Sequence, residues 1–216
     1  MFTGELFPNP WVLPNEQLGP HAWVLRGCAL PHVAEILVAV AAIESASPFR
    51  HMLTPGGHTM SVALTNCGAL GWTSDRQGYR YSATDPLTGQ AWPAMPATLL
   101  RLAREAAAQA GFGHFTPDAC LINRYAPGAR MSLHQDRNEQ DFSAPIVSVS
   151  LGMPATFLFG GRQRSDPVSK VTLVHGDVAV WGAGDRLRFH GVAPLKDKPH
   201  PLLGSQRINL TFRKAA

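Results

Sequence analysis

The sequence predicts an α+β fold that is mainly β, with a jelly roll of eight short antiparallel strands as its core. Beyond residue 119 the chain consists of short apolar runs separated by turns rich in Gly, Pro, Asn and Asp. Before that point, two longer segments carry apolar side chains at helical spacing. The eight expected strands are 119–125, 131–135, 146–152, 155–159, 171–175, 177–181, 187–193 and 207–213.

Two helices are expected ahead of the strands. The first follows Pro31, a residue that the first turn of a helix tolerates, and its apolar positions are Ile36, Leu37, Val40 and Ile43. The second spans residues 96–110 and is ended by Gly111; its apolar positions are Leu99, Leu102, Ala103, Ala106 and Ala110. Residues 1–20 contain four prolines, which indicates an extended or turning arm.

The length fits one globular domain, or one domain with a sizeable elaboration. The chain has 216 residues, of which 45% are hydrophobic and 16% charged, and its net charge of +4 is compatible with an anionic partner without requiring one. Cys28, Cys67 and Cys120 form no CxxC pair, which disfavours a zinc ribbon or a redox dithiol and favours a reducing compartment. With no signal peptide and no apolar run longer than residues 34–43, we expect a cytoplasmic protein without membrane contact.

Residues 48–93 differ from the rest in being rich in Gly, Thr, Ser and aromatic residues. They predict short strands and exposed turns, with Trp72, Tyr79 and Tyr81 close together in the sequence. Two interpretations stay open. The segment is either an irregular subdomain with half-buried aromatic side chains or a lid whose aromatic rings stack on a planar ligand.

Two strands carry an unusual polar face. In "RINLTFR" (207–213), Arg207, Asn209, Thr211 and Arg213 share one face, and in "CLINRYA" Asn123 and Tyr125 do the same. An ordinary strand with one solvated face would explain either pattern alone. If both faces point into a barrel, they need an anionic guest that accepts hydrogen bonds, and two guanidinium groups suit a small dicarboxylate.

A candidate metal site follows the second of these strands. In "SLHQD", His134 and Asp136 are two residues apart, so that both side chains point to one side, and His190 in "LRFHGV" is a third candidate ligand. Two His and one carboxylate form the facial triad of non-haem Fe(II) oxygenases. His175 and Asp177 have the same spacing, but Gly176 between them indicates a hairpin turn whose backbone these side chains bind.

At this point the sequence resembles a known family. The motifs "NRYAPGARMSLHQD" and "RINLTFR", with "PIVSVSLG", "FLFGG", "HGDVAVWG" and "FHGV" between them, closely resemble the AlkB family of Fe(II)/2-oxoglutarate-dependent dioxygenases. Upstream, "TPGGHTMSVALTNCGALGW" and "QGYRYS" are similar to the nucleotide-recognition lid of its founding bacterial branch, which repairs alkylated DNA. The resemblance covers residues 47–213. It implies a double-stranded β-helix (jelly-roll) core (94–216), a lid (47–93), and an N-terminal extension with a supporting helix (1–46).

The resemblance also assigns roles to residues. The Fe(II) ligands fall on His134, Asp136 and His190, with Arg213 beside them in the catalytic centre. The 2-oxoglutarate contacts fall on Asn123, Tyr125, Arg207, Asn209, Thr211 and Arg213. The contacts to the nucleic acid fall on Trp72, Tyr79, Arg80, Tyr81, Asn138 and Arg164. Two positions depart from close relatives: Asn138 stands where they have an acidic residue, and His58 stands where they have Tyr.

The activity implied is oxidative demethylation of N-alkylated bases such as 1-methyladenine and 3-methylcytosine. Such an enzyme uses Fe(II), 2-oxoglutarate and O2, and releases formaldehyde, succinate and CO2. We expect a monomer whose partner is alkylated single- or double-stranded DNA, with RNA as a further candidate. Three alternatives remain: an oxygenase of the same core that acts on a protein or small molecule, a non-catalytic nucleic-acid-binding module, and a sugar binder of the cupin type. The last would leave Arg207 and Arg213 buried without counter-charges.

Overall fold

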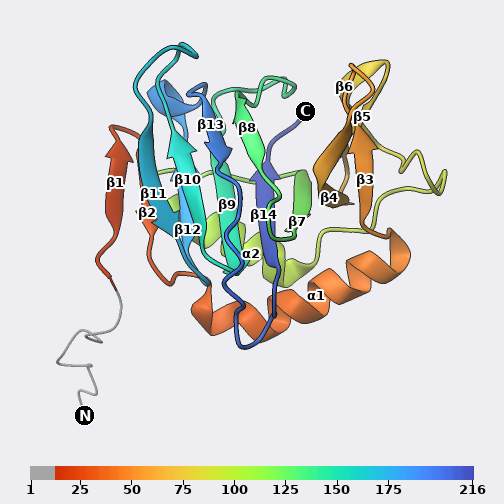
Figure 1. Ribbon diagram of the computed structural model, residues 1–216, viewed down its shortest axis with the longest axis horizontal. Helices are drawn as coiled ribbons and strands as arrows, with labels where there is room; N and C mark the ends of the chain where they lie inside the picture. The colour runs from red at the N-terminus through yellow and green to blue at the C-terminus, as the bar shows by residue number, and fades with distance from the viewer. Residues whose placement is uncertain (1–12) are drawn as a thin grey trace.

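Two facing β-sheets form the body of the molecule in the computed structural model, which describes residues 13–216 (Figure 1). The large sheet contains, in spatial order, β1 (Glu16–Gly19), β2 (Ala22–Leu25), β12 (Val178–Trp181), β9 (Ile146–Gly152), β14 (Arg207–Arg213), β7 (Ala119–Tyr125), β4 (Thr59–Gly68) and β3 (Arg50–Leu53). The small sheet contains β11 (Ser169–Leu173), β10 (Ala155–Phe159), β13 (His190–Val192) and β8 (Met131–His134). Every pairing is antiparallel, as a jelly roll requires, and the predicted fold class is confirmed.

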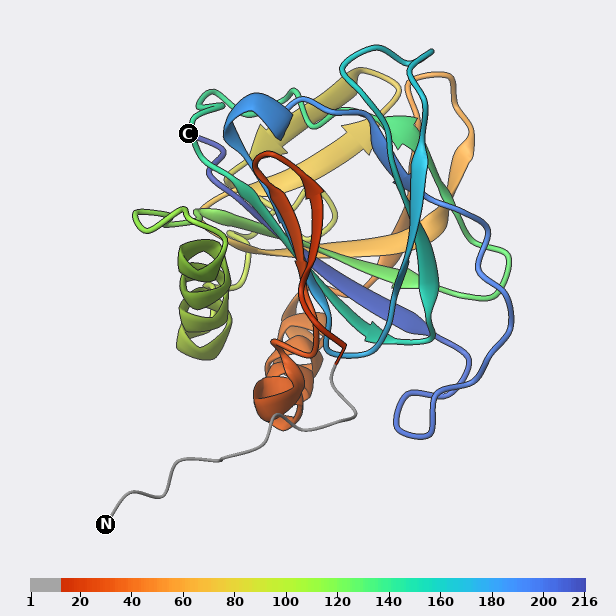
Figure 2. The ribbon, with the colours of Figure 1, turned by 90° about the vertical axis from the view of Figure 1, so that its left-hand side faces the viewer.

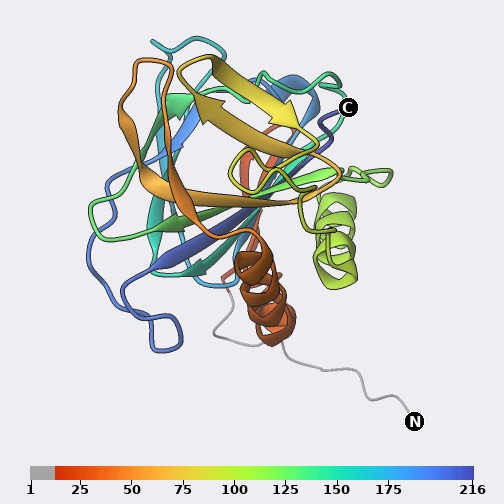
Figure 3. The same ribbon diagram turned by 90° about the vertical axis from the view of Figure 1, so that its right-hand side faces the viewer.

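Two helices cover the outer face of the large sheet (Figures 2 and 3). α1 (Val33–Ala46) follows a short 3-10 turn that contains Pro31, and α2 (Ala97–Gln109) ends before Gly111, whose φ of 91° only glycine adopts readily. Both expected helices are confirmed. One apolar position differs. Ala110 was expected on the buried face, but α2 ends before residue 110, and Ala107 is the fully buried alanine of the last turn. The main hydrophobic core lies between these helices and the large sheet.

The strand predictions differ from the structure mainly at turns. Strands β7, β9, β10 and β14 have the predicted bounds. β11 starts and ends two residues earlier than expected. It begins at Ser169, which pairs with Phe159, and ends at Leu173 because Gly176 (φ 92°) and its neighbours form the tight turn into β12. The β1–β2 hairpin was missed: its strands are only four residues long, and the prolines around them indicated an arm. Part of that predicted arm, residues 1–12, lies outside the described residues.

The segment predicted as a lid divides into two parts. β3 and β4 join the large sheet beside β7, whereas β5 (Gly71–Asp75) and β6 (Gly78–Ser82) form a separate hairpin. In Figures 1 and 3 this hairpin stands above the end of the sandwich that carries β3 and β4. The division into lid and core at residue 93 therefore stays a prediction, and the hairpin is the part that lies outside both sheets.

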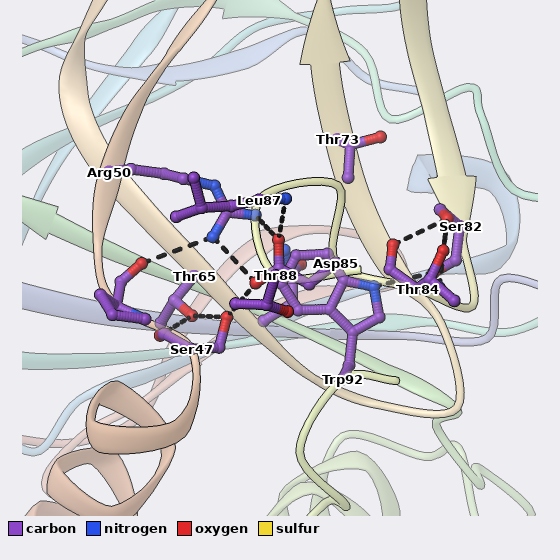
Figure 4. Close-up of polar contacts among 12 residues, drawn as sticks. Ser47, Arg50, Thr65, Thr73, Ser82, Thr84, Asp85, Leu87, Thr88 and Trp92 are labelled. Carbon is purple, nitrogen blue, oxygen red and sulfur yellow. Dashed lines mark hydrogen bonds and ion pairs between the residues drawn. The ribbon is translucent and has the colours of Figure 1, made fainter. Parts of the chain in front are cut away.

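The loop after the hairpin is held by a buried carboxylate (Figure 4). Asp85, which is 1% exposed, accepts hydrogen bonds from Ser47 Oγ (2.6 Å), from the backbone N–H of Leu87 (2.8 Å) and from the guanidinium group of Arg50. Trp92 Nε1 donates to the backbone oxygen of Ser82 (2.9 Å) at the other end of the loop. These bonds fasten the base of the hairpin to the end of α1 and the start of β3.

Two further expectations concern burial and membranes. Cys67 and Cys120 are buried opposite each other on β4 and β7, as small hydrophobic residues would be, whereas Cys28 is half-buried. Within residues 13–216, no helix combines the length and the apolar character that crossing a membrane requires.

Candidate active site

A cavity of about 760 Å³ opens between the two sheets beneath the β5–β6 hairpin. Its walls come from β4, β7 and β14 of the large sheet, from β8 and β13 of the small sheet, and from the hairpin itself. Most of the residues predicted from the sequence meet here. The cavity is lined by His134, Asp136, His190, Asn123, Tyr125, Arg207, Asn209, Thr211, Arg213, Trp72, Tyr79, Asn138, Arg164 and His58.

The three candidate metal ligands lie together on one wall. His134 ends β8 and is paired directly with His190 on β13, and Asp136 follows two residues later. One ligand atom from each residue can be chosen so that all three lie within 4.8 Å of one another. The Nδ1 atoms of His134 and His190 lie 2.9 and 3.0 Å from the backbone oxygens of Ser132 and Arg188, which leaves both Nε2 atoms facing Asp136.

The charges of this cluster suit a divalent cation. Burial alone would raise the pKa of Asp136, but Arg213 and the two imidazoles hold that pKa well below its usual range. Burial, with a smaller contribution from His134, lowers the pKa of His190 to about 3, so that this imidazole is neutral at pH 7. A carboxylate and two imidazole nitrogens on one face form the donor set that Fe(II) takes in oxygenases. The residues present therefore fit an iron ion.

The opposite part of the cavity is built by the register of the large sheet. β14 pairs with β7 so that Arg207 lies opposite Tyr125 and Asn209 opposite Asn123, which places both polar faces on the same side. Arg207 is 1% exposed, and its Nε and Nη1 atoms have no hydrogen-bond partner in residues 13–216; the same is true of Asn123 Oδ1. A buried guanidinium group with two free N–H groups requires an anion. A carboxylate of 2-oxoglutarate fits this requirement.

Two serines behind these residues were missed by sequence reasoning. Ser150 accepts a hydrogen bond from Arg207 Nη2 (2.8 Å), and Ser148 accepts one from Asn209 Nδ2 (2.8 Å). Both lie on β9, where the alternation in "IVSVSLG" placed their side chains on a single face. That alternation was the available signal. The serines fix the orientation of Arg207 and Asn209, which face the cavity.

The hairpin contributes an aromatic pair. The rings of Trp72 and Tyr79 stack with centroids 5.4 Å apart and an interplanar angle of 18°. Asn66, buried in β4, accepts a hydrogen bond from the backbone N–H of Trp72 and donates one to its backbone oxygen, both at 3.0 Å. Sequence reasoning missed Asn66, since one Asn in a strand is no signal. It fixes the position at which Trp72 leaves the sheet.

Arg80 and Tyr81 do not line the cavity. Arg80 points to the other face of β6, as alternation along a strand requires, and forms an ion pair with Asp75 at 2.6 Å. Tyr81 shares the face of Tyr79 but turns inward, where its hydroxyl donates to Glu139 Oε1 (2.6 Å). Their assignment as contacts to nucleic acid stays a prediction.

Glu139 joins the hairpin to the metal cluster and was also missed, because its segment indicated a solvated turn. Its buried carboxylate accepts the hydroxyl of Tyr81 and forms an ion pair with Arg186 (3.1 Å). Arg213 lies between the two carboxylates, with Nε 3.5 Å from Glu139 and Nη2 2.8 Å from Asp136. Arg213 thereby holds Asp136 in position, and its approach to a carboxylate of 2-oxoglutarate stays a prediction.

His175 and Asp177 are not part of the site. Asp177 accepts hydrogen bonds from the backbone of Gly27 (3.0 Å) and Val174 (3.0 Å) and from Arg26 Nη1 (2.6 Å). His175 Nδ1 accepts one from the backbone of Gly152 (2.9 Å). The expected hairpin is wrong, because β11 and β12 lie in different sheets and the turn at Gly176 connects the two sheets. The expected bond to the turn backbone is confirmed for Asp177, at Val174, whereas His175 binds the backbone of β9.

Comparison with known proteins agrees with this geometry. Residues 24–213 match the 2OG-Fe(II) oxygenase superfamily. The alpha-ketoglutarate-dependent dioxygenase AlkB of Salmonella typhimurium is 57% identical over 214 residues, which is 98% of each chain. AlkB of Escherichia coli is 55% identical over 213 residues, which is 98% of this chain and 97% of that one.

The fold has a close structural counterpart. The solved structure of OsALKBH1 superposes with a TM-score of 0.81 and 29% sequence identity, over 93% of this chain and all of the other. Together with the sequence matches, this shows that the chain belongs to the 2OG-Fe(II) oxygenase superfamily and, within it, to the AlkB dioxygenases.

Proposed function

We propose that this dioxygenase removes methyl groups from ring nitrogens of alkylated bases in DNA, with 1-methyladenine and 3-methylcytosine as substrates. The observation that carries the proposal is the arrangement of one cavity. It has a two-His, one-carboxylate cluster on one wall, an unpartnered buried Arg207 opposite, and the Trp72–Tyr79 stack at its mouth. The bacterial relatives with over half identity are AlkB dioxygenases, a group of DNA repair demethylases.

Each residue of the cavity wall has a separate role in this proposal. His134, Asp136 and His190 would hold Fe(II), while Arg207 and Tyr125 would bind the far carboxylate of 2-oxoglutarate. When bound, iron, 2-oxoglutarate and O2 supply the oxidising power that hydroxylates the methyl group, yielding succinate and CO2. Arg213 keeps Asp136 ionised and oriented. The hydroxymethyl base then releases formaldehyde.

The mouth of the cavity would receive a base that has left its stack. An enzyme that reacts at a ring nitrogen of a paired base must extrude that base, and aromatic side chains hold it by stacking. Trp72 and Tyr79 provide such a surface, and His134 lines the same cavity. Arg164 Nη1 donates to the backbone oxygen of Leu133 (2.8 Å), which positions its guanidinium group at the rim for a phosphate.

The proposal includes partners and location. Single- or double-stranded DNA is the main partner and RNA a further one, and the enzyme acts as a monomer. Three unpaired thiols are typical of a reducing compartment and support a cytoplasmic location.

The experiment is a demethylation assay on short single-stranded DNA. The protein is purified without oxygen, loaded with Fe(II) and 2-oxoglutarate, exposed to air, and incubated with an oligonucleotide that carries one 1-methyladenine or 3-methylcytosine. Mass spectrometry is expected to show loss of one CH2 from the oligonucleotide, and His134→Ala to show none. Succinate without CH2 loss would assign the enzyme a protein or small-molecule substrate. If neither is formed, salt-sensitive binding that chelators leave unchanged would indicate a non-catalytic binding module.

A further inference from the structure

Arg186 is a buried arginine that the proposed reaction does not use. It follows the short 3-10 turn Ala183–Asp185, is 2% exposed, and does not line the cavity. Burying a guanidinium group is unfavourable unless its N–H groups find acceptors and its charge finds a counter-charge. The partners of Arg186 therefore indicate what this side chain stabilises.

All of these partners lie in one segment, residues 135–145, which joins β8 to β9 and contains no helix or strand. Arg186 Nη1 donates to the backbone oxygen of Asp136 (3.0 Å), and Nε donates to the backbone oxygen of Ala144 (3.1 Å). Arg186 Nη2 donates to the carboxylate of Glu139 (3.1 Å). Asp136 also belongs to the metal cluster, so Arg186 holds the backbone of a candidate metal ligand from behind the cavity wall.

Arg186 also sets the charge balance around Arg213. Arg213 lies between two buried carboxylates and is closer to Asp136 (2.8 Å) than to Glu139 (3.5 Å). Among residues 13–216, the other cationic side chain that forms an ion pair with Glu139 is Arg186. Two buried guanidinium groups thus balance two buried carboxylates. Without Arg186, Glu139 would compete with Asp136 for Arg213, because opposite charges attract strongly where water is excluded.

We propose that Arg186 is a positioning residue for the metal site: it neutralises Glu139, which leaves Arg213 bonded to Asp136, and it holds the backbone of Asp136. The proposal rests on the proposed function, in which His134, Asp136 and His190 hold the iron. Arg186 does not line the cavity, so it acts through Asp136. Residues that orient a metal ligand in this way contribute about 10–100-fold to metal affinity.

Binding of Co²⁺ to the full chain tests the proposal without turnover. Co²⁺ takes the same kinds of ligand as Fe²⁺ and is stable in air; isothermal titration calorimetry gives its Kd, and its visible absorption reports the coordination. Arg186→Met is expected to weaken Co²⁺ binding about tenfold and to change the absorption. Arg186→Lys keeps a positive charge beside Glu139 and is expected to lose less affinity. If Arg186→Met does not fold, Arg186→Gln replaces it, with the same expectation.

Arg26→Met is the matched control for stability. The side chain of Arg26 is 8% exposed, and it donates to the buried carboxylate of Asp177 (2.6 Å) and to the backbone oxygen of Thr172 (2.7 Å). None of these three residues lines the cavity. Both Met variants should unfold at a lower temperature than wild type, because each leaves a buried carboxylate without a partner. Only Arg186→Met should lose affinity for Co²⁺.

The double variant Arg186→Met/Glu139→Gln separates positioning from folding. Glu139→Gln removes the charge that would draw Arg213 away from Asp136 and keeps a side-chain oxygen for the hydroxyl of Tyr81. The double variant is therefore expected to recover most of the Co²⁺ affinity that Arg186→Met loses. A double variant that binds no better than Arg186→Met would overturn the proposal, and so would an equal loss of affinity in Arg26→Met.

His134→Ala tells a failure of the proposal from a failure of the assigned ligands. Wild-type affinity for Co²⁺ in Arg186→Met, together with lost binding in His134→Ala, would overturn the role of Arg186 and leave the assigned ligands in place. Co²⁺ binding that His134→Ala leaves unchanged would overturn both the ligand assignment and the proposal.

Discussion

The two ends of the cavity are built by different means. At the end that we propose binds 2-oxoglutarate, Arg207, Asn209 and Tyr125 lie in the middle of an eight-stranded sheet, and the backbone ladder fixes which side chains face one another. At the base end, Trp72 and Tyr79 lie on a two-stranded hairpin outside that sheet, and Tyr79 is 45% exposed. Individual side-chain bonds hold the hairpin. The proposed cosubstrate site is thus held by the backbone bonds of a large sheet, and the proposed base-binding surface depends on a few side-chain bonds that single substitutions can alter.

The largest effect is expected from a change that disables the reaction and leaves both ends intact. His134 is 38% exposed in its side chain, so His134→Ala is expected to fold normally while losing one metal ligand. Turnover should fall at least about 1,000-fold, as loss of a group at the reacting centre does. Succinate release and Fe(II) affinity measure this directly. Oligonucleotide binding should remain within a few-fold of wild type; a parallel loss of binding would mean that the substitution disturbs the mouth as well.

Arg207→Met is expected to impair the proposed 2-oxoglutarate site and to leave the proposed base site intact. Removing the guanidinium group that would pair with a carboxylate of 2-oxoglutarate costs about 2–5 kcal/mol of binding free energy. The KM for 2-oxoglutarate is therefore expected to rise at least about 30-fold. Burial already lowers the pKa of Arg207, and removing an unpaired buried charge should leave the ligand-free protein as stable as wild type or more so. Thermal unfolding with and without 2-oxoglutarate checks both parts. Arg124→Met, on the other face of β7, is the control.

Asp85→Ala is expected to impair the proposed base site, by loosening the loop that holds the β5–β6 hairpin, and to leave the proposed 2-oxoglutarate site intact. This change leaves Arg50 without its buried partner, and the N–H of Leu87 and the hydroxyl of Ser47 without an acceptor, at a cost of about 3 kcal/mol in the free energy of unfolding. Urea unfolding measures that cost, and Ser82→Ala, which affects bonds of the same loop nearer the surface, should cost little. The oligonucleotide KM should rise while the KM for 2-oxoglutarate stays unchanged. A rise in both would contradict the separation of the two ends.

The smallest effect tests the connection between the ends. Tyr81→Phe removes the hydroxyl that donates a hydrogen bond to Glu139. The change is expected to lower the free energy of unfolding by about 1 kcal/mol and to raise the oligonucleotide KM roughly fivefold. Tyr79→Phe is the matched control, since the Tyr79 hydroxyl has no protein partner in residues 13–216. Equal unfolding free energies for the two variants would show that the Tyr81–Glu139 bond contributes nothing.

What the sequence could predict follows the same division. Alternation along β14 and β7 identified the residues of the 2-oxoglutarate end, because period two in a strand decides which side chains share a face. Asn66, Glu139 and Asp85 could not be found in this way. Their partners are far away in the chain or are backbone groups, and no local spacing marks a bond such as the one from Tyr81 to Glu139, 58 residues apart. Ser148 and Ser150 were missed at the other end although their alternation was visible, whereas the residues that position the hairpin carried no local signal at all.

The β1–β2 hairpin affects how strongly the protein aggregates in concentrated solution. An eight-stranded sheet has two outer edges, and an unpaired edge is a template for strand addition by another copy. Here both edges, β1 and β3, are four residues long and carry a register irregularity, between Gln17 and Gly19 and between His51 and Leu53. Each interrupts the row of bonds that a visiting strand would need. Removing β1 and β2 would expose the fully buried strand β12 and is expected to make the dioxygenase prone to aggregation, which light scattering of such a truncation would reveal.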